Sequence, residues 1–286
     1  MMKVLGGVLA LVMLAGAAGP ALAQSPFAAA GDPIVVGRSY TINSLVMGQE
    51  RRIHVMLPPG YDAPENRDRR YPVIYLLDGG VEQQDFLHIA GLLHQGGLWG
   101  INEPVILVGV ESGDRRAEFT RPAARAAERE QFPTHGKAET FRRFLVEELK
   151  PAVDAAWRTN GVDGLMGESL AALFVVDVFL NNGVDFDRYI AVSPSLWWDD
   201  QALARQAQGL LAATGQAPRV LWLSIADEGG AMQAGMDRLV AALKARKLPG
   251  VAWSYTPYPQ ESHSTIYHPA ATRAIRVLFP PPAKPR

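Results

Sequence analysis

Cysteine is absent from this chain of 286 residues. Its absence excludes disulfide bridges, lipid attachment to a cysteine, catalysis by a thiolate and zinc sites with sulfur ligands. A protein without covalent cross-links has to be stabilised by its apolar core, and 48% of the residues are hydrophobic. The composition therefore indicates a chain that folds around a large buried core.

A strong excess of one charge is also absent, because the formal net charge at pH 7 is −1. Proteins that bind nucleic acid or anionic membranes carry a basic excess or a basic patch. Neither kind of partner is expected here. No apolar run is long enough to span a membrane, since residues 4–18 form a short stretch with unsuitable flanks.

These N-terminal residues have the organisation of a secretory signal peptide. Lys3 supplies the positive start, residues 4–18 the apolar centre, and Ala21 and Ala23 the small residues of a cleavage site. We predict a signal peptide at residues 1–23, cleaved after Ala23, and hence a secreted or periplasmic protein. A buried N-terminal helix is the alternative.

Residues 24–286 are numerous enough for a single α/β domain with a substantial core. They contain neither an internal repeat nor a linker that would divide them. Residues 279–286 are rich in proline and are expected to form an extended tail. The sequence does not indicate an oligomeric state.

Predicted strands and helices alternate along this domain. The strands are expected at Arg52–Leu57, Tyr71–Leu77, Val105–Val110, Leu165–Gly167, Tyr189–Val192, Val220–Ile225 and Val251–Tyr255. The helices are expected at Gln84–Leu93, Glu139–Trp157, Leu170–Leu180, Gln201–Ala212, Met232–Ala245 and Thr272–Leu278. Continuous apolar strands are typical of parallel sheets covered on both faces. The pattern predicts the α/β class, with a mostly parallel, doubly wound sheet, helices on both faces and an antiparallel start.

Ser169 lies at a predicted turn between a strand and a helix, within Gly167-Glu168-Ser169-Leu170-Ala171. A serine hydroxyl becomes a nucleophile when a sharp turn presents it and a neighbouring base takes its proton. The segment departs from the motif G-x-S-x-G because Ala171 replaces the second glycine. The alternative is that Ser169 caps the following helix.

A serine nucleophile needs a histidine base, and His263 has the most suitable position. It follows the last predicted strand in a turn-like segment, whereas His268 falls at the start of the last helix. His54 lies inside a strand pattern and is expected at the surface. His88 and His94 are six residues apart on a predicted helix and do not share a face, so no metal site is expected.

The acid that orients the base is expected at the end of the strand Val220–Ile225, where Asp227 and Glu228 follow in succession. The chain order Ser169, acid, His263 is the order found in α/β-hydrolases. One of the two carboxylates could instead cap the next helix. The spacing alone does not choose between them.

Backbone amides are the expected donors to the oxyanion of an acyl-transfer reaction. The first is the amide of Leu170, directly after the nucleophile, and the second is that of Gly79, in the turn after an earlier strand. Glycine lets the backbone approach a substrate oxygen closely. The alternative is that Gly79 belongs to an ordinary turn.

Several segments together resemble a known family. They are Leu57–Tyr61 with Tyr71–Gly79, Ile106–Glu111 with Asp114 and Arg115, Phe144–Pro151, and Ser193–Trp198. In this order they resemble the esterase D/Fes-type α/β-hydrolases, a family that also holds the mycolyltransferases. The segment 193–198 is similar to the siderophore (trilactone) esterase branch. The resemblance extends over nearly all of residues 35–278.

The resemblance implies an α/β-hydrolase fold and a serine hydrolase of esters or thioesters that uses no cofactor. It assigns Ser169 as the nucleophile and His263 as the base. Glu228-Gly229-Gly230 resembles the family pattern in which a glutamate is the acid, so Glu228 is preferred to Asp227. The expected substrate is a small-molecule ester.

Candidate substrate contacts are Arg115, Trp197 and Trp198. The arginine could steer an anionic group, and the tryptophans could line an acyl or aromatic pocket; a solvated arginine and packing at the edge of the fold are the alternatives. Ala117 stands where the family usually has a second arginine, which weakens any inference about an anionic or catecholate substrate.

Two other functions fit the same residues. In an acyltransferase, an alcohol would replace water as the acceptor of the acyl group. In a binding protein on a hydrolase scaffold, catalysis would be lost, and Ala171 is the residue that hints at this loss. A siderophore lactone, an acetylated or feruloylated sugar and a short acyl ester all remain possible substrates of an esterase.

Overall fold

One mixed β-sheet organises the structure. The computed structural model describes residues 32–82, 84–213, 217–246 and 248–282, so the predicted signal peptide and the last residues of the tail lie outside the described part. The described strands are β1 (Arg38–Ser44), β2 (Gln49–Met56), β3 (Tyr71–Leu77), β4 (Ile106–Val110), β5 (Thr159–Glu168), β6 (Arg188–Val192), β7 (Arg219–Ala226) and β8 (Val251–Tyr258). They pair in the order β1-β2-β4-β3-β5-β6-β7-β8.

The sheet begins antiparallel and continues parallel. β2 pairs antiparallel with both β1 and β4, and all later pairs are parallel. This is the mostly parallel sheet with an antiparallel start that the sequence predicts. β1 itself was not predicted, because nearly all of its side chains are exposed and an edge strand of this kind has little hydrophobic pattern.

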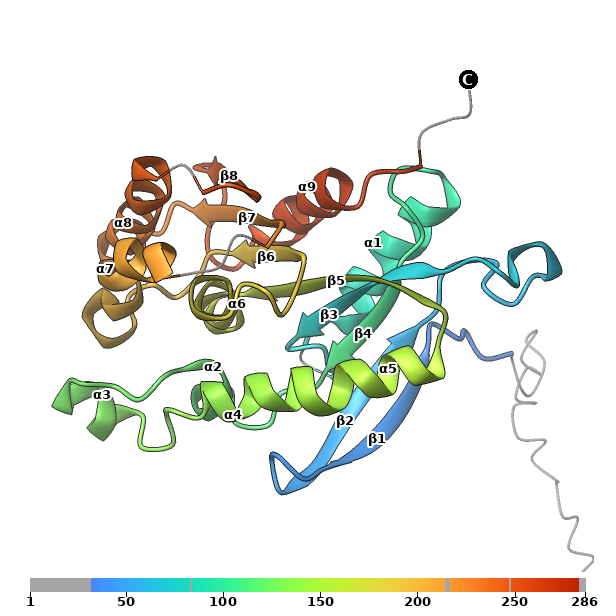
Figure 1. Cartoon of the computed structure of the whole chain (residues 1–286), viewed down its shortest axis with the longest axis horizontal. Coiled ribbons are helices and arrows are strands. Elements are labelled where there is room, and N and C mark those ends of the chain that lie inside the picture. The colour runs from blue at the N-terminus through green and yellow to red at the C-terminus, as the bar shows by residue number, and fades with distance from the viewer. Residues whose placement is uncertain (1–31, 83, 214–216, 247, 283–286) are drawn as a thin grey trace, which may run out of the picture. The chain divides into compact units, whose positions relative to one another are not determined.

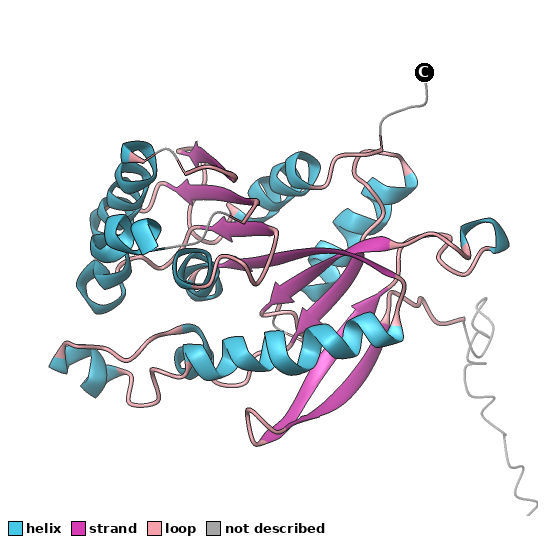
Figure 2. Ribbon diagram, viewed as in Figure 1, coloured by secondary structure: helices cyan, strands magenta, loops and turns pink. Residues whose placement is uncertain are grey.

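Helices cover both faces of the sheet (Figures 1 and 2). The described helices are α1 (Phe86–Leu98), α2 (Arg115–Phe119), α3 (Ala126–Gln131), α4 (Ala138–Arg143), η2 (Phe144–Leu149), α5 (Lys150–Ala156), α6 (Leu170–Asn181), α7 (Trp198–Ala213), α8 (Gly230–Ala245) and α9 (Tyr267–Leu278), with a single 3-10 turn, η1 (Pro64–Asn66). α1 and α9 contribute to one apolar cluster, and α4, α6, α7 and α8 contribute to the other.

The side chains of the central strand β3 alternate between the two apolar clusters, one on each face of the sheet. Val73, Tyr75 and Leu77 point into the cluster beneath α6, and Ile74 and Leu76 point into the cluster beneath α1 and α9. Each of these side chains is at most 1% exposed. The continuous apolar run in the sequence therefore results from burial on both faces of the sheet.

The predicted long helix at residues 139–157 is a continuous helical run built from α4, η2 and α5 (Figure 1). Its centre is π-helical, and the Lys150 amide donates to the carbonyl of Leu145. Pro151 follows and has no amide hydrogen to donate. The last helix, α9, begins at Tyr267, five residues before the predicted start, so His268 lies inside its first turn.

The connection between β4 and α4 holds two helices that were not predicted, α2 and α3. Both are short and carry several charged residues, so they lack the apolar periodicity on which helix prediction depends. The side chain of Asp114 caps α2 by accepting from the amides of Arg116 and Ala117, at 3.1 Å each.

His54 is buried, which corrects the expectation of a surface position. Its side chain is 1% exposed, its Nδ1 lies 2.8 Å from the hydroxyl of Ser39, and its Nε2 lies 3.1 Å from a carboxylate oxygen of Glu111. Both ring nitrogens therefore have partners in strand β1 and after strand β4. Within the described residues, no helix has the length and apolarity needed to cross a bilayer.

Candidate active site

Ser169 lies on a strained turn between β5 and α6. Its φ is 57° and its ψ is −118°, a backbone conformation that residues other than glycine rarely adopt. Hydrogen bonds hold the turn: the Ser169 amide donates to the carbonyl of Val192 at 2.9 Å, and its carbonyl accepts from the amides of Leu173 and Ser195 at 3.0 Å each. The turn thus presents the serine at the carboxyl end of the sheet.

The residues around the turn are small because β5 and α6 approach closely. A Cβ atom added to Gly167 would lie 2.8 Å from the Cβ of Ala171 and 2.9 Å from its carbonyl carbon. The glycine at 167 is therefore required by packing. Ala171, which replaces the second glycine of the motif, is fully buried and is accommodated beside it.

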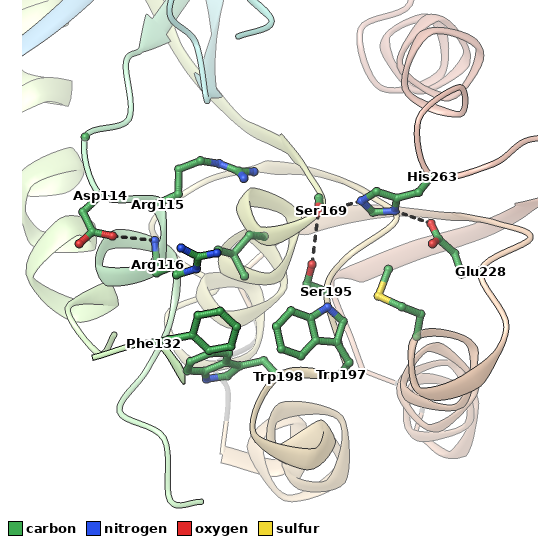
Figure 3. A pocket seen from close by; sticks show the side chains of 13 residues that line it. Asp114, Arg115, Arg116, Phe132, Ser169, Ser195, Trp197, Trp198, Glu228 and His263 are labelled. Atoms are coloured by element: carbon green, nitrogen blue, oxygen red, sulfur yellow. Dashed lines mark hydrogen bonds and ion pairs between the residues drawn. The ribbon is translucent and has the colours of Figure 1, made fainter. Parts of the chain in front are cut away.

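His263 and Glu228 meet Ser169 in a continuous chain of hydrogen bonds (Figure 3). The Nε2 atom of His263 lies 2.9 Å from the hydroxyl of Ser169, and its Nδ1 atom lies 2.6 Å from Oε1 of Glu228. Because a carboxylate only accepts, Nδ1 donates its proton to Glu228 and Nε2 is left to accept from the serine. This is the geometry required of a nucleophile, a base and an orienting acid.

Two loops at the ends of neighbouring parallel strands bring the base and the acid together. Glu228 follows β7 and His263 follows β8, and the amide of Asp227 donates to the carbonyl of Glu261 at 3.0 Å, which joins the two loops. Asp227 is exposed, and the residue that contacts the histidine is Glu228. The structure thus favours the glutamate of the two predicted alternatives.

Ser195 also belongs to the site, although it was not predicted from the sequence. Its side chain is 3% exposed, and its hydroxyl lies 3.3 Å from that of Ser169. It belongs to the segment after β6, the strand beside β5 in the sheet. Ser195 lies in the segment 193–198 that carries the family resemblance. Its contact with Ser169, however, depends on the register between β5 and β6, which the sequence does not reveal.

Of the two predicted oxyanion donors, only Leu170 lines the cavity beside Ser169. Gly79 was predicted wrongly, because its amide donates to the carbonyl of Val110 at 2.9 Å and is not available to a substrate. A Cβ at Gly79 would lie 2.4 Å from the Cα of Gly109, so packing of β3 against β4 explains this glycine. The next amide, that of Gly80, donates to the side chain of Gln84 at 2.8 Å.

A cavity of about 740 Å³ opens beside Ser169 and His263 (Figure 3). Its remaining wall includes aromatic, apolar and cationic side chains: Arg115, Arg116, Phe132, Trp197, Trp198 and Met232. The ring of Phe132 lies 6.1 Å from that of Trp197 and 5.6 Å from that of Trp198. All three predicted substrate contacts therefore line the same cavity, although Trp198 is largely buried, at 6% exposed.

The two arginines of the cavity have different surroundings. Arg115 is paired with Asp78, with its Nη2 at 2.7 Å and its Nε at 2.8 Å from Oδ2, so its charge is partly neutralised. The guanidinium of Arg116 lies 4.7 Å from the centre of the Phe132 ring. No carboxylate partner of Arg116 is found among the described residues.

A buried ion pair fastens the segment that carries these arginines. Arg51 of β2 and Glu118 of α2 are 4% and 3% exposed, and their closest atoms are 2.5 Å apart. Glu118 also accepts from the amide of Gly113 at 3.4 Å. The pair joins α2 to β2, and removal of either partner would leave the other as an uncompensated buried charge.

Glu168, the residue before Ser169, and the nearby Asp85 are carboxyl groups with raised pKa values. Burial, together with the nearby carboxylate of Asp85, raises the pKa of Glu168 to about 8. Burial and the carboxylate of Asp78 raise the pKa of Asp85 to about 6. Perturbed acids of this kind gather at functional sites, because such sites are partly closed to water.

The described residues contain no group of three or more His, Asp or Glu side chains that could hold a metal ion. His88, six residues before His94, is hydrogen-bonded instead to His268 at the start of α9. This pair lies on α1 and α9, the two helices on the other face of the sheet from α6.

Known proteins are similar to most of the chain. A family described as "Putative esterase" matches residues 44–260. The ferri-bacillibactin esterase BesA of Bacillus subtilis is 26% identical over 232 residues, which cover 74% of this chain and 80% of that protein. A siderophore triacetylfusarinine C esterase of Aspergillus fumigatus is 24% identical over 176 residues, covering 57% of this chain and 58% of that protein.

Solved structures agree with the fold. An IroE-like serine hydrolase from Shewanella oneidensis has a TM-score of 0.73 at 27% identity and covers 85% of this chain and 80% of its own. The BES protein from Bacillus cereus has a TM-score of 0.75 at 23% identity and covers 88% of this chain and 99% of its own. These likenesses confirm the α/β-hydrolase fold predicted from the sequence.

Proposed function

The chain belongs to the esterase family and is a carboxylic ester hydrolase, and from this premise we propose that Ser169, His263 and Glu228 form its catalytic triad. The observation that carries the proposal is the pair of hydrogen bonds, 2.9 Å and 2.6 Å long, that links the three side chains. The cavity beside them supplies room for an ester.

The reaction proceeds through an acyl-enzyme. The Ser169 hydroxyl attacks the ester carbonyl carbon while Nε2 of His263 takes its proton, and the carbonyl oxygen becomes an oxyanion. His263 then gives the proton to the departing alkoxide, so that the alcohol leaves and the acyl group stays on Ser169. Water repeats the sequence, with His263 again as the base, and releases the acid. Glu228 stabilises the imidazolium in each half.

The amide of Leu170 is our proposed donor to the oxyanion. It is the first amide of α6, where the helix has unpaired N–H groups and a positive end of its dipole. Leu170 also lines the cavity beside Ser169. Because this amide is held in place by the helix, it can stabilise the negative charge that develops on the substrate oxygen without any rearrangement of the protein.

A siderophore ester is our proposed substrate class. The similar proteins named above are a ferri-bacillibactin esterase and a triacetylfusarinine C esterase. The cavity of about 740 Å³, with an aromatic wall and two arginines, is large enough for a bulky acyl group. An ordinary acetyl ester would fill only a small part of it.

Substitution of the nucleophile tests the triad. Ser169→Ala is expected to lower kcat/KM for p-nitrophenyl acetate and ferri-bacillibactin by about three or more orders of magnitude. A fluorophosphonate probe should label the unsubstituted protein and not the variant. Near-normal hydrolysis by a folded Ser169→Ala protein would overturn the triad, and an unlabelled parent protein would favour a non-catalytic binding role. Turnover of p-nitrophenyl acetate without turnover of the siderophore would overturn the substrate class alone.

We also propose that the protein is exported, to the periplasm or out of the cell. The support is the positive start, the apolar stretch and the small residues Ala21 and Ala23 at the predicted cleavage site. N-terminal sequencing of the exported fraction should begin at Gln24. A protein that begins at Met1 in that fraction, or that stays in the cytoplasm, would contradict this proposal.

A further inference from the structure

We propose that Asp199 is a positioning residue for acyl-group specificity, because it holds the segment that carries Phe132 against Trp197 and Trp198. The inference rests on the proposed function in one respect: it takes the cavity beside Ser169 as the place where the acyl group binds. Asp199 itself lies outside the lining of that cavity.

The carboxylate of Asp199 is buried, at 6% exposed, and is satisfied by backbone groups. One oxygen accepts from the amide of Ala124 and the other from the amide of Arg125, at 2.9 Å each. Hydrogen bonds to an ionised acceptor are stronger than neutral ones. A buried carboxylate that accepts two neighbouring amides is therefore a firm joint between the start of α7 and the segment before α3.

The backbone around Asp199 is strained. Asp199, Asp200 and Gln201 all have left-handed conformations, with φ of 48°, 52° and 62°. Non-glycine residues adopt this conformation at an energetic cost, and a run of such residues persists only where surrounding contacts impose it. The strained turn directly follows Trp197 and Trp198 and precedes the regular part of α7, so it fixes how the chain that carries the two indoles enters the helix.

The other side of the joint carries one wall of the cavity. Residues 124–132 lead from the two amides through α3 to Phe132, whose ring packs on both tryptophans (Figure 3). Within the described part of the chain, the hydrogen bonds that join residues 124–132 to a distant element run to Asp199. Loss of this joint would release the start of the segment, while Phe132 keeps its ring contacts and its backbone hydrogen bonds to Glu128 and His135.

This arrangement makes a specific kinetic prediction. A small acyl group bound at Ser169 does not need the aromatic wall, whereas a planar aromatic acyl group stacks against it. Loosening the wall should therefore raise KM for an aromatic acyl ester and leave kcat, which depends on the triad, unchanged. A residue with a merely structural role would affect both esters alike.

Asp199→Asn is the appropriate variant, because Asn tolerates the left-handed conformation as well as Asp does and keeps one accepting oxygen. Asp200→Asn is the matched control: it has the same backbone conformation, but its carboxylate is exposed and paired with Arg205. Asp199→Asn is expected to raise KM for p-nitrophenyl benzoate by about tenfold and KM for p-nitrophenyl acetate by less than about twofold. The control should change neither value.

The role of Phe132 is tested by combining substitutions. If Asp199 acts through this ring, Asp199→Asn should add less than about twofold to KM for the benzoate in a Phe132→Ala background. A full additional effect in that background, or an equal change for both esters, would overturn the proposal.

Hydrogen exchange tests the joint without any turnover. The amides of Ala124 and Arg125 should exchange about tenfold faster or more in Asp199→Asn than in the parent protein or in Asp200→Asn. Unchanged exchange would overturn the proposal even if the ester hydrolysis described above were absent. If these amides exchange faster in Asp199→Asn but the parent protein hydrolyses neither ester, the hydrogen-bonded joint at Asp199 is supported and the proposed triad is overturned.

Discussion

The hydroxyl of Ser195 lies 3.3 Å from the hydroxyl of Ser169, which also lies 2.9 Å from Nε2 of His263 (Figure 3). The Ser169 proton is directed to Nε2 of His263, so Ser195 is the donor in the contact between the two serines. In the proposed reaction, a donor at this place helps to orient the nucleophilic oxygen and stabilises negative charge that develops on it during attack.

Removal of this donor should slow catalysis moderately. Ser195→Ala is expected to lower kcat/KM for p-nitrophenyl acetate by about three- to tenfold, which is the rate equivalent of one neutral hydrogen bond. The measurement is steady-state kinetics on a variant whose fold is checked by circular dichroism. An unchanged rate would show that the contact does not act in catalysis, and a loss as large as that of Ser169→Ala would show that Ser195 has a more direct role.

Two isosteric substitutions distinguish Glu228, the proposed acid of the triad, from its neighbour Asp227. Glu228→Gln should lower kcat by about two to four orders of magnitude, because the amide can no longer stabilise the imidazolium of His263. Asp227→Asn is the control, since Asp227 is exposed and does not contact the histidine. A larger effect of Asp227→Asn would reverse the assignment.

The raised pKa of Glu168 predicts how stability depends on pH. The pKa rises from an ordinary 4.5 to about 8 in the folded protein, so between these values the folded state binds a proton that the unfolded state has released. Stability should fall as pH rises through this range, by at most about 5 kcal/mol from this group. Asp85, whose pKa is raised to about 6, contributes in the same direction.

Glu168→Gln should flatten this dependence and make the protein more stable than its parent at pH 8 to 9. Urea unfolding at several pH values measures the effect, with the exposed Glu50→Gln as the control. A steeper fall in the Glu168→Gln protein, or none in the parent, would contradict the assignment of a buried proton to this carboxyl.

The aromatic core beneath the nucleophile should dominate stability in a chain without disulfides. Phe174 of α6 is fully buried, and its ring lies 5.3 Å from that of Phe141 and 5.9 Å from that of Phe119. Phe174→Ala is expected to cost about 3–5 kcal/mol in the free energy of unfolding. Leu98→Ala, at a side chain that is 58% exposed, should cost less than about 0.5 kcal/mol in the same urea titration.

The sequence was sufficient for the order of the apolar strands and the longer helices and, together with the family resemblance, for His263 and Glu228 as side chains that meet at Ser169. These features depend on apolar periodicity and on chain order, which are local or follow from the topology of parallel sheets. The segment of α2 and α3 was missed because its helices are short and charged. The left-handed turn at Asp199–Gln201 was missed because none of its residues is a glycine.

The error at Gly79 has a different cause. Whether its amide is free depends on which strand lies beside β3, and the sheet places β4 there, with the carbonyl of Val110 within reach. The contact of Ser195 with Ser169 depends in the same way on β6 pairing with β5. Register between strands that are distant in the chain has no local signal in a single sequence.

The crossing of β5 and α6 at this elbow has no room for a side chain at Gly167, whatever residue stands at position 171. A methyl group at Gly167 would meet the Cβ of Ala171 at 2.8 Å, and also the carbonyl carbon and oxygen of that residue at 2.9 and 3.1 Å. Ala171→Gly removes the first of these contacts and leaves the two backbone contacts in place. A substitution at Gly167 therefore has no compensating partner at position 171, and random variation at this glycine has no neutral route through its neighbour.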